Sequence, residues 1–154
     1  MINLAASFPL DGRNKRDLKL FKNTPKEFFY GTNNLSDRYK VDYIDSRTKP
    51  QTFFLKVILF FEFILSRFRL SVFNISRVLA NRKDYSKYKL IISFTDFYSI
   101  NLGLFYPKKS NQMIIGVFHG LSDIIDRQPI YLRYYAKKQI LKSLKKIDHL
   151  VFLG

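Results

Sequence analysis

Five short apolar runs, separated by stretches of helical character, constrain the fold of this 154-residue chain more than any other feature. The clearest run is Met113–Phe118, which is long enough for a strand, too short for a helix, and apolar at nearly every position. A continuous apolar run of this length indicates a strand buried on both faces, as in a parallel sheet. The other runs expected to form strands are residues 2–6, 41–44, 90–94 and 149–153.

Helical patterns fill the intervals between these runs. Thr24, Pro25 and Glu27 form a helix-start signal, because a threonine N-cap, a proline at the first helical position and a glutamate that closes a capping box occur in that order. Further helices are expected from residue 53 to about residue 81, at 97–105 and at 130–146.

This regular alternation of strands and helices predicts the fold class. It implies one α/β domain over residues 1–154, a Rossmann-like three-layer sandwich. The expected sheet is mostly parallel and has five or more strands, with right-handed crossovers and helices on both faces.

The composition excludes several classes of site. The chain has no cysteine, which excludes disulfides, thiolate chemistry and zinc bound by cysteine. Its two histidines are too few for a histidine-rich metal site, so no metal is predicted. The loop after the first strand lacks the Gly-x-Gly-x-x-Gly pattern of a dinucleotide site.

The formal net charge of +15 predicts affinity for phosphate groups on nucleic acid, on anionic lipid or on phosphorylated small molecules. The basic residues are spread along the chain, which favours a basic surface on a folded body over a basic tail. Nucleic-acid binding is the least supported of these alternatives, because no helix-turn-helix, RNA-recognition or zinc signature occurs.

Residues 53–73 form the most apolar stretch, and two interpretations of it stay open. Spanning of a membrane is not expected, because Lys56, Glu62, Arg67 and Arg69 interrupt the stretch and each charge costs about 2.5–3.5 kcal/mol near a bilayer centre. The aromatic surface either packs on the sheet or lies in a membrane interface with its basic groups toward phospholipid.

Polar residues follow two of the predicted strands at the point where each strand ends. His119 comes directly after Met113–Phe118, and Asp96 follows the strand at 90–94. Ligands of open α/β sheets bind beyond the carboxyl ends of the strands, so His119 lies where chemistry is expected. The alternatives are that His119 is only a polar residue leaving the sheet, and that Thr95 or Asp96 caps the following helix.

Four segments carry a resemblance to a known family. They are the first strand with its loop from Pro9 to Gly12, the stretch Lys87-Tyr88-Lys89-Leu90-Ile91-Ile92-Ser93-Phe94, the stretch Ile114-Ile115-Gly116-Val117-Phe118-His119-Gly120, and the helix at 130–146 leading into Asp148-His149-Leu150-Val151-Phe152-Leu153. Together they resemble the N-terminal, acceptor-side domain of a GT-B glycosyltransferase of the retaining group that builds bacterial polysaccharides and glycolipids.

The resemblance implies a site between two Rossmann-like domains, of which the first binds the acceptor and the second binds the nucleotide-sugar. It implies that His119 is catalytic and stands near the reacting sugar, and that Asp96 and Gly120 contact the acceptor. Gly12 and Arg13 would face the donor phosphates. No cofactor beyond the nucleotide-sugar co-substrate and no metal is implied.

The resemblance also has departures. Only Gly12 stands where the family often has two adjacent glycines, and the nucleotide-sugar domain is not found in these residues. We therefore expect a missing C-terminal domain, and we expect residues 1–154 to be inactive alone. The expected partners are a sugar or lipid-linked acceptor and an anionic membrane surface, with a cytoplasmic, peripheral location. The alternative is a non-catalytic binding or scaffold module with a basic, membrane-facing surface.

Overall fold

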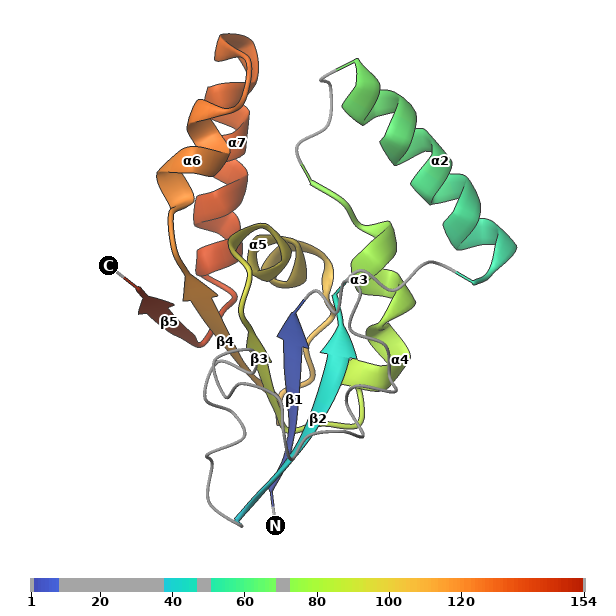
Figure 1. Ribbon diagram of the computed structural model, residues 1–154, viewed down its shortest axis with the longest axis vertical. Helices are drawn as coiled ribbons and strands as arrows, with labels where there is room; N and C mark the ends of the chain where they lie inside the picture. The colour runs from blue at the N-terminus through green and yellow to red at the C-terminus, as the bar shows by residue number, and fades with distance from the viewer. Residues whose placement is uncertain (1, 9–37, 47–50, 69–72, 154) are drawn as a thin grey trace, which may run out of the picture.

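The sheet that the apolar runs predict is present. The computed structural model describes residues 2–8, 38–46, 51–68 and 73–153, and within them five parallel strands pair in the order β2-β1-β3-β4-β5 (Figure 1). The strands are β1 (Ile2–Phe8), β2 (Tyr39–Asp45), β3 (Leu90–Ser93), β4 (Met113–Phe118) and β5 (His149–Phe152). The chain therefore has an all-parallel, Rossmann-like α/β fold.

The strand sequences are apolar because both faces of the sheet take part in packing. Ala5, Ile91 and Ile114 are neighbours across three strands and are fully or almost fully buried on the face that the described helices cover. Leu4 and Ala6 point to the opposite face, where they belong to a second buried cluster. Side chains alternate between the faces along a strand, so β1, β2, β3 and β4 each supply residues to both clusters, whereas the residues of β5 are exposed.

The described helices follow the strands in chain order. They are α2 (Phe53–Arg67), α3 (Ser76–Ala80), α4 (Arg82–Tyr85), α5 (Asp96–Phe105), α6 (Leu121–Asp126) and α7 (Ile130–Leu144). Residues of α3, α4, α5 and α7 share one core cluster with the strand residues of one face. The helix predicted to start at Thr24 lies outside the described residues.

Close packing between α5 and α7 sets the position of both helices on the sheet. The Ser143 hydroxyl on α7 is buried and donates a hydrogen bond to the Ile100 carbonyl of α5 at 2.8 Å. A Cβ atom on Gly103 would lie only 2.2 Å from Ser143 Oγ and 2.8 Å from its carbonyl oxygen. The helices can approach this closely only because residue 103 lacks a side chain.

The prediction of one helix from residue 53 to about residue 81 is wrong. Helix α2 ends at Arg67, and α3 begins at Ser76. The Glu62 carboxylate accepts hydrogen bonds from the Ile75 and Ser76 N–H groups at 2.5 and 3.0 Å and from the Ser76 hydroxyl at 2.5 Å. In a continuous helix Glu62 and Ser76 would be about 21 Å apart along the axis, so the chain folds back to make these bonds.

Smaller differences concern element ends and one helix. Residues 121–126 form α6, where the sequence predicts no helix. Strand β1 extends to Phe8 and β2 begins at Tyr39, while α7 ends at Leu144 instead of residue 146. None of the described helices is long and apolar enough to cross a membrane.

Candidate functional site

The two predicted site residues at the strand ends are brought together by the pairing of β3 with β4. Ser93 of β3 lies opposite Gly116 of β4, so the chain leaves both strands at the same edge of the sheet. Asp96 then begins α5, and His119 follows β4 directly (Figure 1). This edge is where ligands bind in open parallel sheets.

Asp96 holds the loop that follows β4. Its Oδ1 atom accepts a hydrogen bond from the His119 N–H at 2.7 Å, and its Oδ2 atom accepts one from the Gly120 N–H at 2.9 Å. Both bonds are short and charge-assisted, which makes them stronger than bonds between neutral groups. The carboxylate thus fixes the backbone of residues 119 and 120 relative to α5.

The N-cap position of α5 falls at Thr95, one of the two predicted residues, but without a side-chain capping bond. Asp96 lies inside the first turn and directs its carboxylate to the neighbouring loop instead. A carboxylate in the first turn still interacts favourably with the helix dipole.

The His119 imidazole is half exposed beside this carboxylate. Its Nδ1 atom lies 3.5 Å from Asp96 Oδ1, which is longer than a hydrogen bond, and 48% of the side chain is accessible to solvent. In the described part of the chain, the other ring nitrogen, Nε2, has no hydrogen-bond partner. The imidazole is therefore anchored through its own backbone and can turn either nitrogen toward a ligand.

A hollow of about 310 Å³ opens beside His119. Its lining consists of Asp96, Phe97, His119, Gly120, Asp123, Ile124 and Arg127. This volume is at the lower end of the range for small-molecule sites. Carboxylate, imidazole and guanidinium groups around one hollow are suited to hydrogen-bonding a ligand that carries hydroxyl groups.

Two charged residues of this hollow, Asp123 and Arg127, were not among the predicted site residues. Asp123 on α6 has its Oδ2 atom 3.5 Å from the guanidinium of Arg127, the C-cap residue of α6, and the two side chains are 68% and 80% exposed. An exposed pair of this kind contributes little to stability, so both groups are free to interact with a ligand. Their spacing of four residues, which suits an ion pair on a helix, was the signal that could have predicted α6.

Neither the backbone conformation at residue 120 nor the packing around it requires glycine. The φ of −172° at Gly120 is extended backbone that any residue adopts, and a Cβ atom there would meet only Asp123 Cγ at 3.9 Å. Gly120 is one of the residues that line the hollow.

A buried hydroxyl network lies behind the carboxyl ends of β1 and β2. Tyr85 links Ser7 at 2.6 Å to Tyr98 at 3.0 Å, and the Asn81 amide donates to Tyr98 at 3.1 Å and to the Asp45 carbonyl at 2.9 Å. Burial raises the pKa of Tyr85 well above its ordinary value and also raises that of Tyr98. Both phenols thus stay neutral and serve as structural hydrogen-bonding groups.

The predicted site residues do not all fall in the part of the chain that can be described. Asp96, His119 and Gly120 are brought together, whereas Gly12 and Arg13 lie outside the described residues. Within those residues, no group of three or more histidine, aspartate or glutamate side chains is placed to hold a metal ion.

Comparison of the chain with protein-family models, with curated proteins and with solved structures gives no match.

Proposed function

We propose that this domain binds the acceptor in a glycosyltransferase that moves a sugar from a nucleotide-sugar to a polysaccharide or glycolipid. The observation that carries the proposal is the Asp96–His119–Gly120 arrangement at the carboxyl ends of β3 and β4. A rigidly anchored loop presents an accessible imidazole over a small polar hollow, which suits a polyhydroxylated ligand.

In this proposal His119 is the residue that touches the reacting sugar. A half-exposed imidazole can donate to or accept from a sugar hydroxyl. Asp96 acts as a positioning residue, because its oxygens already accept the N–H groups of residues 119 and 120. Phosphates of the donor would be bound by a second Rossmann-like domain, on this chain or on another one.

The Asp123–Arg127 pair adds specificity at the rim. The two side chains are mostly exposed and only 3.5 Å apart, so a ligand hydroxyl can bridge them. Phe97, which is 37% exposed and stacks on Phe73 at 6.1 Å between ring centroids, supplies an apolar surface for a sugar ring.

The test is sugar transfer by the protein purified from its own cells. Radiolabelled UDP- and GDP-sugars are offered with glycolipid and polysaccharide extracts of the same cells as acceptors. We expect the wild type to label an acceptor, and we expect His119→Ala to lose at least about a hundredfold in rate, the lower range for loss of an acid–base or charge-stabilising group.

Ile2→Ser is the folding control, since Ile2 lies at the opposite end of the sheet and is 43% exposed. Absence of transfer with every donor, or full transfer by His119→Ala, would contradict the proposal.

The second candidate is a non-catalytic module that binds a partner or an anionic membrane through its basic surface. The exposed aromatic and basic side chains of α2 favour it. It predicts that the protein binds a partner or a membrane, and that His119→Ala leaves this binding unchanged.

A further inference from the structure

Helix α2 exposes most of its apolar side chains. Its exposed large hydrophobic residues, together with the C-cap residue, are Phe53, Phe54, Phe60, Phe61, Phe63, Leu65 and Phe68. The six phenylalanines are 58–84% exposed. At 150–250 Å² for each aromatic side chain, they present on the order of 800 Å² of apolar surface. This is more than the largest patch of an ordinary monomer, which indicates a surface that binds something.

The acidic residue of α2 is turned away from this surface. On a helix of 3.6 residues per turn, Glu62 lies about 180° from Phe53. It is 8% exposed, and its carboxylate is bound to the start of α3. The carboxylate that counts against membrane spanning in the sequence is therefore turned into the protein and hydrogen-bonded there.

The charges that remain exposed on α2 are positive. Lys56 and Arg67 lie about 20° apart around the helix, between Phe63 and Phe60. Helix α2 thus combines an aromatic face with two basic residues near one edge of that face and no exposed carboxylate. This combination is typical of a helix that lies in the interface of an anionic membrane.

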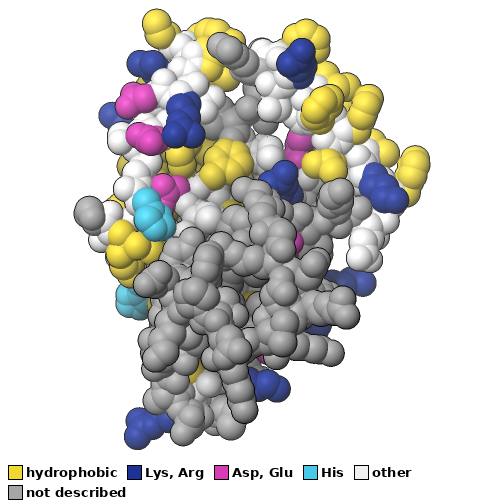
Figure 2. Space-filling model, in the orientation of Figure 1, with side chains coloured by type: hydrophobic (Ala, Val, Ile, Leu, Met, Phe, Trp, Pro, Cys, Tyr) yellow, Lys and Arg dark blue, Asp and Glu magenta, His cyan; other side chains and the backbone are white. Residues whose placement is uncertain are grey.

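The start of α7 provides a second apolar tip on the same side of the molecule. Ile130, Tyr131 and Tyr134 are 84%, 67% and 78% exposed, and α7 contains no acidic residue. Both α2 and the α6–α7 corner project beyond the carboxyl ends of the strands (Figure 1), and hydrophobic and basic side chains lie over both in the space-filling view (Figure 2). The nearby Asp123 and Asp126 of α6 are accompanied by Arg127 and Arg133.

We propose that α2, assisted by the start of α7, docks the protein on the surface of an anionic phospholipid membrane. A bilayer fits this surface better than a folded protein does, because two separate projecting elements can enter a fluid interface without shape complementarity. Lys56 and Arg67 of α2 and the net charge of +15 match anionic headgroups. Docking would turn the hollow beside His119 toward the membrane, within reach of a lipid-linked ligand.

Sedimentation with lipid vesicles tests the proposal. The 154-residue chain is mixed with vesicles of phosphatidylcholine alone or of equimolar phosphatidylcholine and phosphatidylglycerol. We expect at least about tenfold tighter binding to the anionic vesicles, and we expect added salt to weaken it. Phe60→Ser combined with Phe61→Ser is expected to weaken binding about tenfold or more, since two exposed aromatic anchors are lost.

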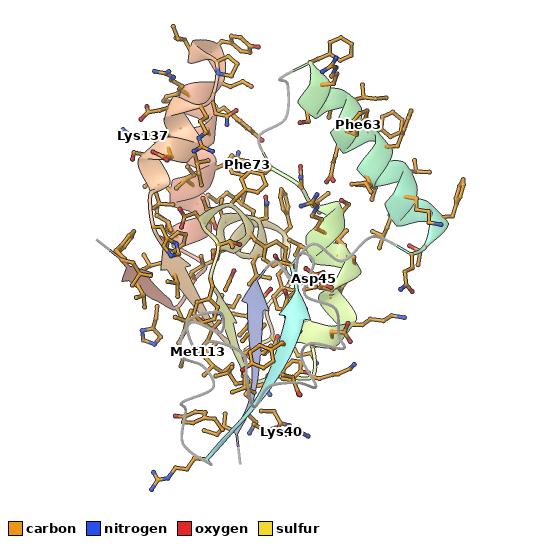
Figure 3. All side chains as sticks on the ribbon, viewed as in Figure 1. Lys40, Asp45, Phe63, Phe73, Met113 and Lys137 are labelled. Atoms are coloured by element: carbon orange, nitrogen blue, oxygen red, sulfur yellow. The ribbon has the colours of Figure 1, made fainter. Side chains whose placement is uncertain are left out.

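Matched controls separate α2 from the rest of the surface. Lys56→Gln with Arg67→Gln is compared with Lys40→Gln and Lys83→Gln, which remove the same charge from exposed positions elsewhere. Only the α2 pair is expected to weaken binding, by about tenfold. Figure 3 labels Lys40 at the end of the sheet opposite α2. Ile2→Ser with Met113→Ser is the apolar control, because both residues are about as exposed (43% and 42%) and lie at that same end.

A tryptophan probe reports which part of the protein enters the lipid. The chain contains no tryptophan, so Phe63→Trp on α2 and Met113→Trp at the far end of the sheet each introduce a single reporter (Figure 3). Brominated lipid is expected to quench the fluorescence of the tryptophan at position 63 and not that of the tryptophan at position 113. Equal quenching, no vesicle binding, or α2 variants that bind like the wild type would each overturn the proposal.

Self-association lost in the α2 variants, without any lipid binding, would show that a second copy covers this face and would overturn it too. Vesicle binding does not depend on sugar transfer, so failure of one proposal leaves the other standing.

Discussion

Replacement of Asp96 by asparagine tests whether this carboxylate organises the loop of residues 119 and 120. The amide has the same shape as the carboxylate, but one of its two oxygens becomes an NH₂ group. In the wild type the backbone nitrogens of His119 and Gly120 lie 2.7 and 2.9 Å from the carboxylate oxygens. In the variant the NH₂ group therefore faces one of these two N–H groups. Two donors then confront each other, so the isosteric change is expected not to preserve the loop.

The magnitude follows from the two hydrogen bonds. Bonds to charged groups contribute about 1.5–3 kcal/mol each, which sets a ceiling of about 3–6 kcal/mol. The lower part of this range applies, because the Asp96 and His119 side chains are 19% and 48% exposed and water can reach the loop. We expect Asp96→Asn to lower the free energy of unfolding by about 2–3 kcal/mol, as much as Asp96→Ala does.

Urea unfolding of the two variants and of wild type measures this loss, and amide hydrogen exchange at residues 119 and 120 locates it. Asp123→Asn is the matched control. It removes the same charge from the lining of the same hollow, but its exposed pair with Arg127 is worth about 0–1 kcal/mol. If Asp96→Asn unfolds at the wild-type urea concentration, the carboxylate does not hold the loop and the reasoning fails.

Two further predictions concern the scaffold. Gly103→Ala is expected to cost about 1–3 kcal/mol in urea unfolding, because overpacking against α7 outweighs the gain of about 1 kcal/mol in helix propensity. Gly120→Ala is its neutral control, and equal stability of the two variants would contradict this packing argument. Burial opposes ionisation of Asp148, but hydrogen bonds from Lys108 and the Ile114 N–H outweigh it and lower its pKa. Its stabilising effect is thus present above its unfolded pKa of about 3.9 and is lost as the pH falls through the lower folded pKa, so Asp148→Asn is expected to flatten the acid limb of a stability–pH curve. An unchanged acid limb would refute this assignment.

Local pattern was sufficient for the strands and for the position of His119. Strands β1 to β4 are short apolar runs because both faces of the sheet are packed there, and this requirement is visible in the residues themselves. The same runs place His119 at a strand end. Helix α6 was missed because it has only six residues, too few for a clear hydrophobic period.

Contacts between distant residues were beyond local pattern. The Glu62 carboxylate looked like a charge that interrupts a long apolar helix, but it caps the start of α3 after the chain folds back. The orientation of α2 depends on those bonds, and the exposed aromatic face follows from it. No periodicity in residues 53–73 could indicate this partner.

The sequence by itself determined the fold class, since alternating buried strands and helices can bury their apolar surface only in a parallel α/β sheet. It also determined that His119 and Asp96 follow strands. The tertiary structure decided that β3 and β4 are neighbours, that Asp96 holds the backbone of residues 119 and 120, and that Glu62 is turned inward. Asp96 and His119 are 23 positions apart, and they meet because β3 and β4 are neighbours in the sheet. Periodicity over a few residues determines where a helix or strand forms. Which ends of those elements lie together is determined only when the whole elements pack.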